Sequence, residues 1–179
     1  PMVATARLIK QEHPDASVVF IGPCASKKLE ASRRTVRSDV DFVITFEELT
    51  GMFEAKGILL DEIKAMDEMK DATAAGRGYG VAGGVANAIK DCIEQYYPGT
   101  PVNIQHAESL AECKKALLLA KAGKMNGCLI EGMACPGGCI AGAGTNIAIP
   151  VAARAVDKFK NEAEKKVPDE SVDQEMVEL

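Results

Sequence analysis

The most informative segment of this chain is Cys128-Leu129-Ile130-Glu131-Gly132-Met133-Ala134-Cys135-Pro136-Gly137-Gly138-Cys139. Its apolar start, residues 128–130, predicts a buried strand, and the segment runs directly into two cysteines separated by Pro-Gly-Gly. A second apolar run, residues 18–21, likewise ends at Gly22-Pro23, just before Cys24. Strands that alternate with helices imply parallel β-α-β units. We therefore expect an α/β fold, with a mostly parallel sheet flanked by helices.

Local signals place the other elements along the chain. Thr45 followed by Glu48 has the form of a capping box, and Gly57 is a suitable stop for the helix that this box opens. Pro150 suits the first turn of a last helix. The expected strands are residues 18–21, 41–44, 102–104 and 128–130, and the expected helices begin near residues 2, 46, 85, 107 and 150, the last two ending near residues 122 and 166.

The cysteines that follow strands are the candidate site. In parallel α/β folds ligands bind at the carboxyl ends of strands. Cys135 and Cys139 can converge on one metal centre, and Gly137 and Gly138 between them would let the backbone approach closely and point N–H groups at sulfur. A loop disulfide or a pair of buried cysteines is the alternative. Two thiolates never complete a cluster, so a third ligand is needed, and Cys24 is the natural one.

Cys24 and Lys27 would share one face if a helix starts at this point, because they are three residues apart. An ammonium group beside a thiolate-bound anionic cluster would neutralise charge and donate hydrogen bonds. The alternative is a core cysteine next to solvated lysines. Strand-end placement of both cysteine motifs leads us to expect Cys24, Cys135 and Cys139 close together.

Composition narrows the classes of partner. The 179 residues carry a formal net charge of −5, which argues against nucleic acid or an anionic membrane surface as the main partner. No apolar run reaches the roughly 18 residues that span a bilayer, and we expect a cytoplasmic protein. Of the six cysteines, Cys92, Cys113 and Cys128 lie in no motif, so we expect simple burial for them.

Two motifs resemble a known family. Pro23-Cys24-x-x-Lys27-Lys28-x-Glu30 and Glu131-x-Met133-x-Cys135-x-x-Gly138-Cys139 resemble the second and third signature motifs of the iron-only (di-iron) hydrogenases. Residues 41–45 and the run Tyr79-Gly80-x-x-Gly83-Gly84 are similar to further landmarks in the same order. The resemblance extends from about residue 15 to about residue 145. It implies the fold of the C-terminal part of the iron-only hydrogenase large subunit.

The resemblance also implies a domain division and a cofactor set. Residues 1–167 would form the C-terminal part of the catalytic domain and begin inside the parent domain, and residues 168–179 would be an acidic, loosely ordered tail. In the family four cysteines hold a [4Fe–4S] cluster, one of which bridges to a di-iron subcluster. The resemblance implies that Cys24, Cys135 and Cys139 are metal ligands, with Cys139 as the bridging one. It places Gly137 and Gly138 beside the cluster and makes Lys27 a donor to a cyanide ligand. Met133 would pack against the di-iron unit, and Tyr79 would lie near the pocket of that unit.

The implied activity is the reversible reduction of protons to dihydrogen, with a ferredoxin-like electron donor or acceptor as partner. The family's first motif, a Cys-Cys-Pro run that supplies the fourth ligand and a proton-relay cysteine, does not occur in these 179 residues. We therefore expect the missing upstream part of the domain to be a partner, and the chain by itself to be inactive and without cluster. Gly22, where many members have Met, leaves room for a slower or sensory member.

Three other interpretations stay open. A non-catalytic relative that acts in iron–sulfur cluster assembly or sensing would share these cysteine motifs. A zinc or redox-dithiol module is a simpler alternative. The run from Gly78 to Gly83 matches the pattern GxGxxG, but no apolar strand precedes it, so we expect a glycine-rich turn before a helix rather than a dinucleotide site.

Overall fold

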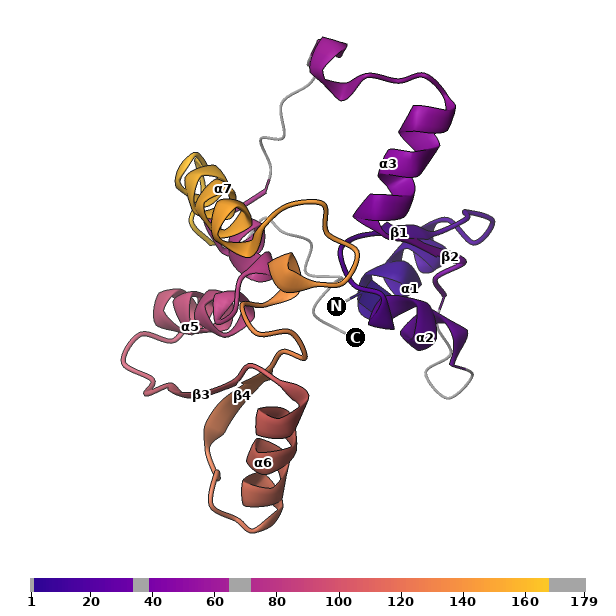
Figure 1. Cartoon of the computed structure of the whole chain (residues 1–179). Coiled ribbons are helices and arrows are strands. Elements are labelled where there is room, and N and C mark those ends of the chain that lie inside the picture. The colour runs from indigo at the N-terminus through magenta and orange to yellow at the C-terminus, as the bar shows by residue number, and fades with distance from the viewer. Residues whose placement is uncertain (1, 34–38, 65–71, 168–179) are drawn as a thin grey trace. The chain divides into compact units, whose positions relative to one another are not determined.

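The computed structural model describes residues 2–33, 39–64 and 72–167. These residues form two compact units (Figure 1). The first unit contains residues 1–66 together with residues 142–146, and the second contains residues 67–141 and 147–179. The tail predicted at residues 168–179 lies outside the described residues. Each unit is an α/β arrangement built on a pair of parallel strands.

The first unit pairs two short strands and covers one side of them with a helix. Its helices and strands are α1 (Met2–Glu12), β1 (Val19–Ile21), α2 (Ser26–Ser32), β2 (Phe42–Ile44) and α3 (Phe46–Ala55). Strands β1 and β2 are parallel, with Val19 opposite Phe42. The core consists of Met2, Val3 and Ala6 from α1 with Val40, against which Phe20 and Val43 pack. The apolar side of α1 therefore holds the sheet in place.

The capping box predicted for α3 is confirmed. The Thr45 hydroxyl accepts a hydrogen bond from Glu48 N at 3.2 Å, and the Glu48 carboxylate accepts one from Thr45 N at 2.9 Å. Two backbone donors at the start of the helix are thus satisfied by side chains. The helix ends as expected before Gly57, whose φ of 66° is left-handed.

The second unit contains a second pair of parallel strands. Its elements are α4 (Ala74–Arg77), α5 (Gly84–Tyr96), β3 (Asn103–Ala107), α6 (Leu110–Lys121), β4 (Cys128–Gly132) and α7 (Ile149–Asn161), with 3₁₀ turns at Gly78–Gly80 and Cys139–Ala141. β3 and β4 are in parallel register, with His106 opposite Glu131 and Ala107 opposite Gly132. Helix α6 lies alongside this pair (Figure 1).

The predicted parallel strands are confirmed, but several element boundaries differ from those expected. The helix expected from residue 107 begins at Leu110, because pairing with β4 keeps Ala107 in β3 and the Ser109 hydroxyl then caps the helix. The last helix ends at Asn161 rather than near residue 166. The chain turns there so that the carbonyls of residues 165 and 166 accept hydrogen bonds from Ala74 N and Ala75 N, at the start of α4.

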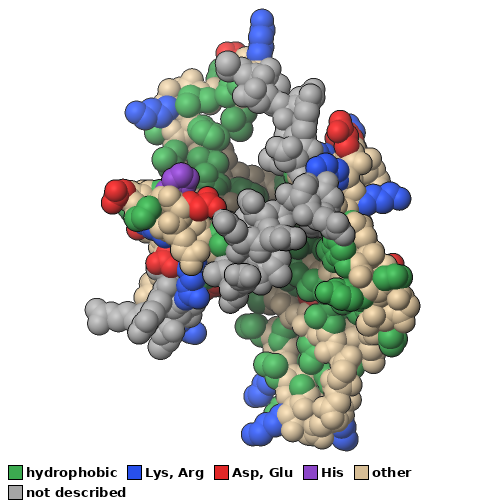
Figure 2. Space-filling view, turned by 180° about the vertical axis from the view of Figure 1, so that it is seen from behind, with side chains coloured by type: hydrophobic (Ala, Val, Ile, Leu, Met, Phe, Trp, Pro, Cys, Tyr) green, Lys and Arg blue, Asp and Glu red, His purple; other side chains and the backbone are tan. Residues whose placement is uncertain are grey.

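Several large hydrophobic side chains remain on the surface. Figure 2 shows hydrophobic side chains open to solvent on one face of the molecule. In the first unit Val19, Ile21 and Phe42 on the strands are 44%, 46% and 61% exposed. Parallel sheets are normally covered on both faces, so the uncovered side of β1 and β2 lacks the layer that such sheets have. Among the described residues, no helix combines the length and the apolar character needed to cross a membrane.

Candidate functional site

Cys24 lies in the first unit, three residues beyond the end of β1, where the sequence predicted a site. Its thiol is free and half-buried. Helix α2 begins at Ser26 and not at Cys24, and the bond from Lys27 N to the Cys24 carbonyl, at 3.2 Å, closes the turn that leads into it. Cys24 therefore precedes the helix that carries Lys27.

The two lysines after Cys24 both make ion pairs. Lys27 pairs with Glu30 on the next turn, and these side chains are 26% and 33% exposed. Lys28 pairs with Glu48 of the capping box, and these side chains are 43% and 48% exposed. The hydrogen bond from Lys28, followed by that from Thr45 N, holds the pKa of the Glu48 carboxyl below its usual value. The ion pair with Glu30 therefore holds the Lys27 side chain along the surface of α2.

Gly22 and Gly144 mark close approaches around the Cys24 segment. A Cβ at Gly22 would lie 2.8 Å from the Phe20 ring, so the space of a larger side chain is taken by Phe20. Gly144 N donates to the Pro23 carbonyl at 3.0 Å, and a Cβ at Gly144 would lie 2.5 Å from Cβ of Thr45. The segment 142–146, which starts three residues after Cys139, is thus fixed beside the residue that precedes Cys24.

The second pair of cysteines lies in the second unit, in the loop that follows β4. Cys135 and Cys139 are half-buried and form no disulfide. Gly137 and Gly138 have φ of 95° and 90°, which L side chains rarely adopt. Their N–H groups were expected to point at sulfur, and this was wrong: Gly138 N donates to the Cys135 carbonyl at 3.0 Å and Gly137 N donates to Glu108 Oε2 at 3.1 Å.

The cysteine loop packs backbone to backbone on the glycine-rich turn. Ala82 N donates to the Gly137 carbonyl at 3.1 Å. A Cβ at Gly138 would lie 2.7 Å from the Val81 carbonyl carbon and 2.8 Å from Gly80 O. Residues 78–84 therefore form a turn that opens α5, as predicted, and the element directly before this turn is helix α4. Two glycines on the loop permit this approach.

Glu131, which the sequence placed in the third motif without a role, and His106 share one hydrogen-bond network in the second unit. The Glu131 carboxylate is buried, and its Oε2 accepts from Gly83 N at 2.7 Å and lies 3.1 Å from His106 Nδ1. Its Oε1 accepts from Val85 N at 3.1 Å and Ala86 N at 3.2 Å. The signal in the sequence was an acidic residue inside an apolar strand, but its partners are 25 to 48 residues away.

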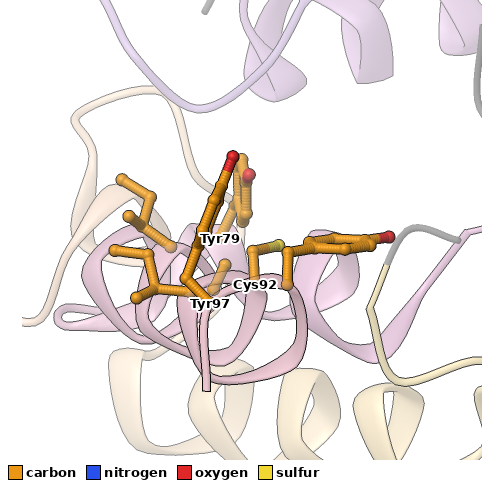
Figure 3. A pocket seen from close by; sticks show the side chains of 7 residues that line it. Tyr79, Cys92 and Tyr97 are labelled. Atoms are coloured by element: carbon orange, nitrogen blue, oxygen red, sulfur yellow. The ribbon is translucent and has the colours of Figure 1, made fainter. Parts of the chain in front are cut away.

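Tyr79 lines a small apolar pocket against α5 (Figure 3). The pocket has a volume of ≈ 190 Å³ and is walled by Tyr79, Ala88, Ile89, Cys92, Ile93, Tyr96 and Tyr97. Burial, followed by the charge of Asp91, raises the pKa of the Cys92 thiol. Cys92 is therefore a protonated packing residue at neutral pH.

Met133 and Cys113 lie near the start of the cysteine loop, and Cys128 lies at the opposite end of β4. Met133 N donates to the Ala107 carbonyl at 2.8 Å, which extends the contact between β3 and β4 by one bond. The Cys113 thiol lies 3.6 Å from the Ala107 carbonyl oxygen and 3.8 Å from that of Met133, so Cys113 supports the same backbone. Cys128 Sγ is 3.3 Å from Asn103 Nδ2. These thiols are half-buried rather than fully buried.

Cys24 belongs to the first unit, and Cys135 and Cys139 belong to the second. The expected closeness of all three thus stays a prediction. Within either unit, the described residues contain no group of three or more His, Cys, Asp or Glu side chains placed to hold a single metal ion.

Comparison with known proteins defines the class of this chain. The family model for the iron only hydrogenase large subunit, C-terminal domain, matches residues 1–143. The chain belongs to this family, and its parallel α/β units have the family's fold.

Individual relatives agree with this assignment. The apo [FeFe]-hydrogenase HydA1 from Chlamydomonas reinhardtii, in a variant form, matches 99% of this chain and 62% of its own with a TM-score of 0.64 and 20% identity. The HydA(deltaEFG) form of [FeFe]-hydrogenase matches 92% of this chain and 60% of its own, with a TM-score of 0.62 and 21% identity. At such identities the likeness shows the fold.

A curated relative matches a shorter region. The cytosolic Fe-S cluster assembly factor NAR1 of Kluyveromyces lactis is 44% identical over 52 residues, which are 29% of this chain and 11% of that protein. The chain thus spans about three fifths of the solved hydrogenase chains and a small part of the assembly factor.

Proposed function

We propose that this chain is part of a hydrogenase that interconverts protons and dihydrogen at a [4Fe–4S]-linked di-iron centre. The observation that carries the proposal is the Cys135–Cys139 loop. It follows a strand of a family fold, carries two half-buried thiols that form no disulfide, and its two left-handed glycines pack against the glycine-rich turn at residues 78–84. Only Pro136, Gly137 and Gly138 lie between the two cysteines, so the two sulfurs are the reactive side chains of the loop.

The donor set of the chain fits an iron–sulfur cofactor. Cys24, Cys135 and Cys139 are half-buried, form no disulfide, and each follows a strand end. Thiolates are the ligands that iron–sulfur clusters use. In the proposal these three cysteines hold the [4Fe–4S] cluster, with Cys139 bridging to the di-iron unit. The bound cofactors would supply the redox and hydrogen chemistry, and a fourth ligand must come from outside this chain.

Other side chains have supporting roles in this proposal. Lys27 would donate a charge-assisted hydrogen bond to an anionic ligand of the di-iron unit, after parting from Glu30 or through a hydrogen not used in that pair. Met133, fixed by its backbone bond to Ala107, would pack against the di-iron ligands. Gly137 and Gly138 would border the cluster. Tyr79 would lie beside the pocket of the di-iron unit.

The proposal also includes two partners, the rest of the catalytic domain and an electron-transfer protein. The chain spans 60% of the HydA(deltaEFG) chain. The remaining part of such a catalytic domain would supply the missing ligand and cover the apolar strand face of the first unit. A ferredoxin-like protein would exchange electrons with the cluster. A cytoplasmic location fits this chemistry.

A second candidate function is a non-catalytic role in iron–sulfur cluster assembly. The 44% identity to the NAR1 assembly factor over 52 residues favours it. Both functions would use the cysteine motifs, but only the hydrogenase needs carbonyl and cyanide ligands on iron.

Infrared spectroscopy of the full-length protein, produced together with the hydrogenase maturation proteins, separates the two functions. Carbonyl and cyanide stretching bands are expected for the hydrogenase. A protein that contains the cubane iron but shows no such bands would contradict the hydrogenase proposal and favour the assembly role. A protein that binds zinc in place of iron would contradict both.

A further inference from the structure

Glu131 caps the N-terminus of helix α5, a role that the side chain of the N-cap residue normally has. The N-cap residue of α5 is Gly83, with φ of 82° and no side chain to accept a hydrogen bond. Glu131 at the end of β4 accepts instead from the N–H groups of Gly83, Val85 and Ala86. A carboxylate is also favoured at this end of a helix by the helix dipole. The cap of α5 therefore comes from a distant strand.

The Glu131 carboxylate is fully committed to donors. Each of its oxygens has two donor partners, and the fourth partner is His106 Nδ1, at 3.1 Å. An ionised Glu131 can only accept hydrogen bonds, and in that state we infer that Nδ1 of His106 carries the hydrogen. His106 faces Glu131 directly in the register of β3 and β4, and its ring lies 3.5 Å from where a Cβ at Gly83 would be. His106 thus contacts the same carboxylate oxygen, Oε2, that accepts from Gly83 N.

The glycine-rich turn and the chain that follows β4 also contact each other at the cysteine loop. The turn that Glu131 binds at Gly83 also touches Gly137 and Gly138 through Ala82 N and the backbone of residues 80–82. From Glu131 the chain reaches Cys135 in four residues. The glycine-rich turn is therefore held at two points. Glu131 binds it at Gly83, and the cysteine loop packs on it at residues 80–82.

We propose that Glu131 is a positioning residue for the Cys135–Cys139 loop, and that His106 positions Glu131. The carboxylate fixes the glycine-rich turn against β4, and the turn then fixes the backbone of the loop and the spacing of its two thiols. The effect on metal binding rests on the proposed function, whereas the effect on the loop does not.

The first test is Glu131→Gln in the 179-residue chain. Glutamine has the same size, but its NH₂ group faces donors that need an acceptor, so the turn should loosen. Maleimide labelling of the native protein, resolved by cysteine with mass spectrometry, should be about tenfold faster at Cys135 and Cys139. Cys24 and Cys128 should keep their rates. Glu94→Gln, an exposed change at the far end of α5, is the matched control and should alter none of them.

A pair of His106 variants keeps the test decisive if Glu131→Gln unfolds. The side-chain amide of asparagine places a donor near the position of Nδ1, so His106→Asn should retain slow labelling of the loop. His106→Ala removes the donor and should raise the rate at Cys135 and Cys139 about threefold. In the unaltered chain, ¹⁵N chemical shifts should show His106 with hydrogen on Nδ1, and this signature should disappear in folded Glu131→Gln.

The outcomes are distinguishable from those of the proposed function. Labelling of the loop that does not change in folded Glu131→Gln, or equal rates for His106→Asn and His106→Ala, would overturn the positioning role. Iron retention in the full-length protein should fall in Glu131→Gln and stay normal in Glu94→Gln. A full-length protein that never binds iron defeats the proposed function, while the labelling result still decides the role of Glu131.

Discussion

Gly138 and Gly51 show how differently the structure uses the same residue. Gly138 has φ of 90° and faces the backbone of residues 80–82, where a Cβ would overlap. Gly51 lies inside α3, and beyond its chain neighbours and the backbone of its own helix no described atom lies within 4 Å of the place a Cβ would take. At one position a methyl group is excluded, and at the other it would favour the helix.

We therefore expect opposite effects from two identical changes. Gly138→Ala should lower the free energy of unfolding by on the order of 3 kcal/mol, because backbone strain and overlap add. Gly51→Ala should raise it by about 0.5–1 kcal/mol through better helix propensity. Urea unfolding of the two variants measures both. Similar stabilities for the two variants would show that the loop does not pack on the turn as described.

Lys27 and Lys28 allow a second comparison, in the full-length protein. Lys27→Ala removes a charge-assisted bond worth roughly 1.5–3 kcal/mol, so retention of the di-iron unit should fall about tenfold or more. Lys28→Ala breaks an exposed pair with Glu48, where exposed pairs contribute little, and should leave di-iron retention nearly unchanged. Infrared band intensity is the measurement, and equal losses in the two variants would remove Lys27 from the site.

Residues with local signals were predictable, and residues with distant partners were not. The cysteine spacing and its two glycines could be recognised because their meaning lies within five positions. The pairing of Glu131 with Gly83 and His106 depends on strand register and on the path of the chain, which the sequence does not display locally. The Lys28–Glu48 pair was missed for the same reason.

At the scale of elements, the start of α3 has the clearest energetic basis. Thr45 is buried and its hydroxyl caps the helix, so Thr45→Ala should cost about 1 kcal/mol of unfolding free energy. Thr5→Ala on the exposed side of α1 is the control and should be neutral or slightly stabilising. Urea unfolding compares them, and a loss in both variants alike would contradict a specific capping role.

The capping box of Thr45 and Glu48 should also make the free energy of unfolding depend on pH. The pKa of Glu48 is lowered in the folded chain, so its contribution is present above the usual value of 4.5 and is lost as the pH falls through the lower folded value. Unfolding free energy measured between neutral pH and pH ~3 should thus fall more in the unaltered chain than in Glu48→Gln. Parallel curves for the two proteins would refute this linkage.

Elements were predicted where a cap or a stop marks them and misjudged where tertiary contacts set the boundary. The box at Thr45 and the stop at Gly57 gave α3 correctly. β3 was expected to end at residue 104 but continues to Ala107, because β4 supplies bonding partners over its whole length. α7 ends early because the backbone beyond it bonds to the start of α4.

At the scale of the whole molecule, each unit has only a thin core. Its strands are paired in twos, and Val19, Ile21 and Phe42 lie open on one sheet. The chain spans about three fifths of the solved hydrogenase chains that it matches. We therefore expect the 179 residues alone, after attempted maturation, to evolve hydrogen from a reduced dye only at background level. Activity well above background would show that the site needs no further ligand.

The central claim is that Cys24, Cys135 and Cys139 bind iron while Cys92 and Cys128 only pack. The most direct test is iron content per chain in five single Cys→Ala variants of the full-length protein, purified without oxygen. Cys24→Ala, Cys135→Ala and Cys139→Ala should each lose most of the iron of this cluster, because a thiolate ligand is removed. Cys92→Ala and Cys128→Ala should retain it. Iron content that is unaffected by Cys24→Ala, or reduced equally by Cys92→Ala, would contradict the account.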